Sequence, residues 1–104
     1  MSMDIGINTQ KPDEGRFTRE LQDVACGVWF TRTGRIMPKT MKYQDAEGMI
    51  QFIGNIQVHS HEKKYYCGIP LWEYRCSTVC EGREYQYRLY YYIDTGCWKV
   101  SWGG

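Results

Sequence analysis

Apolar and polar residues alternate through most of the last third of the chain. Residues 71–102 form three strand-like runs, separated by glycine turns at Glu81-Gly82 and Thr95-Gly96. A period of two is typical of β-strands that bury one face. If each turn is the two-residue loop of a hairpin, the three runs make an antiparallel meander.

The two turns also predict the register of this meander. A loop at Glu81-Gly82 places Tyr74 opposite Leu89, and a loop at Thr95-Gly96 places Leu89 opposite Trp102. Both turns direct the apolar side chains to the same face, and a slip of one residue would turn them all to water. The residues predicted to face the core are Trp72, Tyr74, Tyr87, Leu89, Tyr91, Trp98, Val100 and Trp102.

The preceding part of the chain reads as a helix followed by short strands. Apolar residues from Phe17 to Val28 recur at helical spacing, with Asp13 as an N-cap and Gly27 at the end. This pattern predicts a helix over residues 14–26. Extended runs then follow, with a polar turn expected at 61–64; these runs are 27–32, 35–45, 49–53, 56–59 and 65–67.

Together these elements predict a mainly β fold of the β-rich α+β class. One N-terminal helix would precede a strongly bent antiparallel meander of about six strands, or a small, partly open barrel. A chain of 104 residues is long enough for one domain with a single modest core. We expect that domain to span residues 13–104, after a flexible polar tail over residues 1–12.

Charge and hydropathy narrow the class of protein. The chain has 13 basic and 12 acidic residues, and none of its thirds is basic enough to predict nonspecific nucleic-acid binding. No apolar run approaches the length of a membrane span, and the N-terminal residues lack the apolar region of a signal peptide. These patterns favour a cytoplasmic protein without a membrane partner.

The five cysteines fit a reducing compartment. Their odd number and irregular spacing argue against a disulfide framework. Cys76 and Cys80 lie on one predicted strand, where four residues span roughly 13 Å, about twice the reach of a disulfide. We therefore expect free thiols, with Cys76 buried as a small apolar side chain.

One short motif has a catalytic counterpart. Asp94-Thr95-Gly96, preceded by Ile93, resembles the catalytic triplet of aspartic proteases, which use two such aspartates in a dimer. The resemblance covers four residues, and in that family the triplet lies early in the chain rather than eight residues from its end. A hairpin turn accounts for Asp, Thr and Gly equally well.

The two histidines raise the question of a metal. If one strand carries both, His59 and His61 point to the same face and can share a zinc ion with a cysteine such as Cys67. The alternative is a solvated turn with two exposed histidines. We see no nucleophile–base pair and no phosphate loop, so the sequence favours a protein that is not an enzyme and has no cofactor or metal.

The outward face of the meander offers the best candidates for binding. In the predicted register Arg75 lies opposite Arg88, which is destabilising unless an anion or an aromatic ring relieves it. Tyr92 lies opposite Lys99, a geometry suited to a cation–π contact. The candidate binding residues are Arg75, Arg88, Tyr90, Tyr92 and Lys99.

Three interpretations of this face remain open. Tyrosine and arginine are common anchors of protein interfaces, and they also stack and pair with single-stranded nucleic acid. Alternatively, Tyr90 and Tyr92 pack beneath the helix or another strand. We expect a small non-catalytic binding or adaptor domain that contacts a protein partner, with a single-stranded nucleic-acid-binding module or a small zinc-binding protein as the alternatives.

Overall fold

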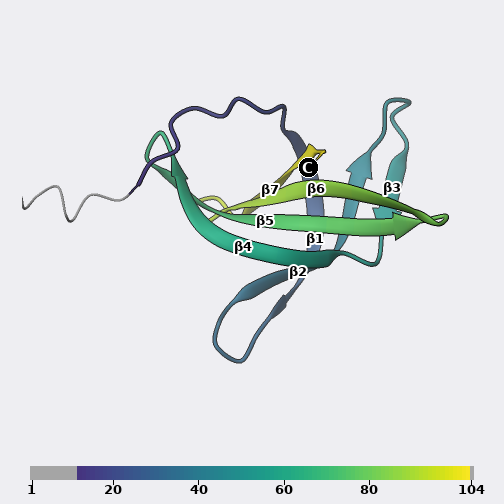
Figure 1. The fold of residues 1–104 in the computed structure, drawn as a ribbon, viewed down its shortest axis with the longest axis horizontal. Helices are drawn as coiled ribbons and strands as arrows, with labels where there is room; N and C mark the ends of the chain where they lie inside the picture. The colour runs from purple at the N-terminus through teal and green to yellow at the C-terminus, as the bar shows by residue number, and fades with distance from the viewer. Residues whose placement is uncertain (1–11, 104) are drawn as a thin grey trace, which may run out of the picture.

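The computed structural model describes residues 12–103, and all regular secondary structure in this range is β-strand (Figure 1). The strands are β1 (Gln22–Phe30), β2 (Ile36–Gln44), β3 (Ile50–Ile53), β4 (Gln57–Tyr66), β5 (Ile69–Cys80), β6 (Arg83–Tyr92) and β7 (Cys97–Trp102). They form one open sheet in the order β3-β2-β1-β7-β6-β5-β4, with every neighbouring pair antiparallel. No helix in the described range is able to cross a membrane.

The sheet consists of two meanders, β1–β3 and β4–β7, joined where β1 pairs with β7. This junction is short, because only residues Gln22 to Val24 of β1 pair with β7 before the strand continues alongside β2 alone. The β1–β2 hairpin consequently leaves the plane of β4–β7 and crosses behind it (Figure 1). The fold is therefore a curved, open sheet with β3 and β4 at its two edges.

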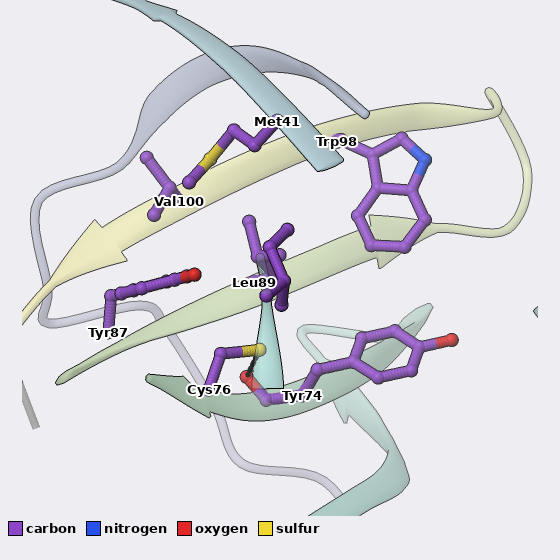
Figure 2. Close-up of a cluster of buried hydrophobic side chains, with 8 residues drawn as sticks. Met41, Tyr74, Cys76, Tyr87, Leu89, Trp98 and Val100 are labelled. Atoms are coloured by element: carbon purple, nitrogen blue, oxygen red, sulfur yellow. Dashed lines mark hydrogen bonds between the residues drawn. The ribbon is translucent and has the colours of Figure 1, made fainter. Parts of the chain in front are cut away.

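The core fills the concave side of this curve. Met41 of β2 faces Leu89 and Val100 of the second meander (Figure 2). Across the core, the Tyr74 hydroxyl donates to the carbonyl of Ile36 at 2.5 Å, which ties β5 to β2. The buried members of the cluster are Met41, Ile56, Tyr74, Cys76, Tyr87, Leu89, Trp98 and Val100.

Most of the predicted core residues are confirmed. Five of the eight are buried, and Trp72 and Tyr91 are half-buried and pack against the cluster. Trp102 is the exception, because it lies at the end of the last strand and remains 43% exposed. A residue's place in the alternation thus predicts its face correctly, but not how far the opposing layer covers it.

The predicted register is confirmed for one hairpin and wrong for the other. Tyr74 pairs with Leu89 across β5 and β6, as a Glu81-Gly82 loop requires. Between β6 and β7, Leu89 pairs with Val100 rather than Trp102, because the loop spans residues 93–96. A shift of two residues keeps every side chain on its predicted face, so the same residues still face the core.

The predicted helix over residues 14–26 is wrong. Residues 12–21 have no regular structure, and residues 22–26 belong to β1. Val24, Cys26 and Val28 also alternate with polar or small residues, and pairing with both β7 and β2 satisfies this period of two. The predicted tail over residues 1–12 lies, apart from Pro12, outside the described residues.

The turn expected at residues 61–64 is also wrong. β4 runs without interruption from Gln57 to Tyr66, so two predicted short strands merge into one. Lys64 of β4 forms an ion pair with Glu73 of β5 at 2.9 Å, and a β-bulge lies at His59, between Val58 and Ser60. A polar run can remain in a strand when the neighbouring strand supplies complementary charge.

Candidate functional site

Residues 12–21, called the N-terminal segment below, cross the outward face of β4–β7 (Figure 1). The Phe17 ring stacks on Tyr66 with centroids 3.9 Å apart and meets Tyr90 edge-on at 5.1 Å. Tyr90 is therefore 0% exposed. Packing under a covering segment was one of the expected interpretations, and an extended segment takes the place of the predicted helix.

Hydrogen bonds fix this segment at both ends. The Asp13 carboxylate accepts from the amides of Gly68 at 2.7 Å and Cys67 at 3.1 Å, in the β4–β5 turn. The amide bonds, chiefly that from Gly68, lower the pKa of Asp13. At the other end, Arg19 donates to the Ser101 hydroxyl at 2.7 Å. The segment is thus part of the fold rather than a loose tail.

A buried carboxylate lies beneath this cover. Glu73 is 1% exposed, and its oxygens lie 2.9 Å from Lys64 Nζ and 3.4 Å from an Arg88 guanidinium nitrogen. Burial by itself raises the pKa of Glu73, but the ion pair with Lys64, the nearby Tyr90 hydroxyl and the charge of Arg88 lower it on balance. Glu73 thus places an anion beside Arg88, one member of the facing pair Arg75 and Arg88.

The other candidate residues of the outward face are partly engaged. Lys99 Nζ lies 2.6 Å from Asp23 and 5.7 Å from the centroid of the Tyr92 ring. Lys99 pairs with Tyr90 rather than Tyr92, so the cation–π contact forms on the diagonal. Arg75 is exposed opposite Ser60, and Tyr92 is half-buried. The structure therefore turns much of the predicted binding face into internal packing.

The histidines, cysteines and acidic triplet show no catalytic arrangement. The bulge turns His59 toward Ser77, at 2.6 Å, whereas His61 stacks on Tyr74 on the opposite, core face. Within residues 12–103 no group of three possible metal ligands occurs. Burial raises the pKa of Cys26 to about 12. Residues 94–96 form an exposed turn.

A groove opens at the end of the sheet where β3 approaches the β5–β6 hairpin. Its volume is about 600 Å³, within the range of ligand and peptide sites. Aromatic and amide side chains make up most of the lining, and Asp45 is the only charged residue in it. The aromatic residues that line it are Tyr43, Phe52, Tyr85, Tyr87 and Trp102.

The floor and one wall of the groove are fixed by hydrogen bonds. The Thr78 and Tyr87 hydroxyls share a bond of 2.5 Å at the floor, and burial raises the pKa of Tyr87 to about 12. The indole of Trp102 donates to Gln22 at 2.9 Å and meets the Tyr43 ring edge-on at 4.8 Å. These rings keep their positions without a ligand, which lowers the entropic cost of binding.

The opposite wall is apolar and exposed. Phe52 is 62% exposed, and its ring lies over Gly54, where any Cβ would come within 2.9 Å of it. Val79, which also lines the groove, is exposed, and so is Ile50, two residues before Phe52 on β3. Exposed apolar side chains that gather around a hollow are typical of a surface that another molecule covers.

The backbone at this wall also lacks a strand partner. β3 is an edge strand, with no neighbour on its outer side in the described part of the chain. β4 pairs with β5 only as far as Ser77, and beyond it the Asn55 side chain donates to the Val79 carbonyl at 3.1 Å. An edge with free N–H and C=O groups is a template for one more strand.

The groove was not among the sequence-based candidates. Its members come from β1, β2, β3, β5, β6 and β7, and only the curvature of the sheet brings them together. The one available signal was the unusual run Met49 to Ile53, which is apolar on both faces of a short strand. No family model matches the chain, and neither a curated protein nor a solved structure is similar to it.

Proposed function

We propose that this protein is a non-catalytic binding domain that takes an extended, apolar peptide segment of a protein partner in the groove beside β3. The observation that carries the proposal is the coincidence of a free strand edge with an aromatic hollow. Strand addition supplies backbone hydrogen bonds, and alternate side chains of the added segment enter the hollow.

The charges around the groove favour a partner segment with basic flanks. Asp45 and Glu47 lie in the β2–β3 turn, and Glu81 and Glu84 outnumber Arg83 at the β5–β6 turn. The Asp45 carboxylate accepts hydrogen bonds from the Met49 amide and the Gln51 side chain, both at 2.9 Å. It therefore stabilises the turn and also contributes negative charge at the groove. The apolar wall excludes a strongly charged ligand from the groove itself.

Selection from a displayed library of random peptides tests the proposal. We expect enrichment of peptides with alternating apolar residues and flanking Lys or Arg. In a titration of a selected peptide, the variants Phe52→Lys and Trp102→Ala should each weaken binding at least roughly tenfold, as truncation of an interface anchor does. Both side chains are exposed enough for the fold to tolerate these changes.

Phe30→Lys is the matched control, because Phe30 is a similarly exposed phenylalanine at the end of another strand. It should leave peptide affinity unchanged. The proposal fails if no peptide is enriched over an unrelated β-protein, or if the Phe52 and Trp102 variants bind the selected peptides as the unaltered protein does.

A further inference from the structure

Beyond Asp23, the β1–β2 hairpin carries charge of one sign only. Between Asp23 and Asp45 the chain contains no acidic residue, whereas Arg32, Arg35, Lys39 and Lys42 are basic. The chain as a whole is nearly neutral, with 13 basic and 12 acidic residues. Folding therefore concentrates positive charge on one element that leaves the plane of the sheet (Figure 1).

Two large rings accompany this charge. Trp29 is 69% exposed and Phe30 is 72% exposed, although both belong to a strand. As consecutive residues of β1 they lie on opposite faces of the hairpin. The ammonium group of Lys39 lies 5.3 Å from the centroid of the Trp29 ring. Each face of the hairpin therefore presents a ring, and Lys39 lies beside the ring of Trp29.

The end of the hairpin is held in one conformation. The Thr31 amide donates to the Arg35 carbonyl at 2.8 Å, and the Thr31 hydroxyl accepts from the Arg35 amide at 3.0 Å. Gly34, with a φ of 84°, closes this loop. Directly beside the loop, the Tyr74 hydroxyl donates to the carbonyl of Ile36. Little conformational entropy remains to be lost when a ligand binds.

We propose that the β1–β2 hairpin binds single-stranded nucleic acid, with unpaired bases stacking on Trp29 and Phe30 and phosphates pairing with Arg32, Arg35 and Lys39. Stacking requires an exposed ring face, and the sugar–phosphate backbone requires cations at intervals beside the rings. The hairpin provides both. This site is separate from the groove and does not rest on the proposed peptide binding.

An anionic membrane surface fits the hairpin less well. A wedge that enters a bilayer leads with its apolar side chains and keeps its basic groups at the headgroups. Here the order is reversed, because Arg32 lies in the loop beyond Trp29 and Phe30. Insertion of the rings would drag this arginine into the bilayer first, whereas an oligonucleotide can contact ring and arginine together.

Fluorescence anisotropy with a labelled oligothymidine of about 12 nucleotides tests the proposal, since single-strand sites span several nucleotides. We expect Trp29→Ala to weaken binding roughly tenfold and Trp29→Phe to retain most of the affinity. The double variant Arg32→Ala, Arg35→Ala loses two phosphate contacts. A plot of the logarithm of the association constant against the logarithm of the salt concentration should therefore become less steep, by about 1.4.

Arg83→Ala is the matched control, because Arg83 is an exposed arginine beside the turn of another hairpin. It should change neither the affinity nor the salt slope. Failure of the unaltered protein to bind at low salt, or equal binding by the Trp29→Ala and Arg83→Ala variants, would overturn the proposal. So would binding to vesicles of anionic phospholipid without binding to the oligonucleotide, or equal competition by duplex DNA.

Discussion

At the scale of single residues, Glu73 is the only buried charged side chain within residues 12–103. We predict that Glu73→Gln lowers the free energy of unfolding by about 2 kcal/mol, because Lys64 and Arg88 lose the anion that they share beneath the N-terminal segment. Urea denaturation measures the change. Glu62→Gln is the control: Glu62 lies 3.4 Å from the same lysine but is exposed, so the loss should stay below about 0.5 kcal/mol.

The same carboxylate predicts how stability depends on pH. The pKa of Glu73 is lower in the folded protein than its ordinary value of 4.5, so near pH 4 the unfolded chain binds more protons than the folded one. The contribution of Glu73 is complete above that value and is lost as the pH falls through the folded pKa. Thermal melts between pH 7 and pH 3 should show a steeper acid decline for the unaltered protein than for Glu73→Gln. If the melting temperatures of the two proteins fall equally with pH, Glu73 does not cause the acid destabilisation.

The sequence predicted correctly on which face of the sheet a side chain lies. It did not predict whether another segment of the chain buries that side chain. The alternation correctly placed Tyr87, Leu89 and Val100 on the core side. It also placed Tyr90 on the outward side, where it is completely buried, because Phe17 is 73 positions away and its contact is purely tertiary. A pattern along one strand has no information about what lies above it.

At the scale of elements, the N-terminal segment is a structural cover for the outward face. We predict that Phe17→Ala lowers the free energy of unfolding by about 2 kcal/mol, less than for a fully buried phenylalanine, because the ring packs on Tyr66 and Tyr90 but is itself only half-buried. Phe30→Ala removes an exposed ring and should cost under about 0.5 kcal/mol. Equal losses in the two variants, measured in urea, would contradict this role.

The elements predicted wrongly share a physical cause. Residues 17–28 satisfy both a helical spacing and, from Val24 onward, a strand alternation, and the long-range pairing of β1 with β7 and β2 decides between them. Residues 61–64 look like a turn until Glu73 of β5 supplies a partner for Lys64. The meander was predictable because its β5–β6 turn and its alternation agree locally.

At the scale of the whole molecule, the open sheet separates two surfaces of different character. The groove by β3 is apolar with acidic turns at its rim, and the β1–β2 hairpin is basic with exposed rings. Neither surface was predictable from the sequence, because the groove requires six strands to converge and the hairpin's exposure follows from the short β1–β7 junction. The expected binding class remains a proposal, now with different contact residues.

The central claim is that β3 accepts an added strand, and amide hydrogen exchange of β3 with a selected peptide bound tests it most directly. Amides of alternate β3 residues that point away from β2 should exchange slowly in the complex and fast in the free protein, while amides of the β1–β2 hairpin loop stay unchanged. Unchanged exchange along Ile50–Ile53 in a saturated complex would contradict the account.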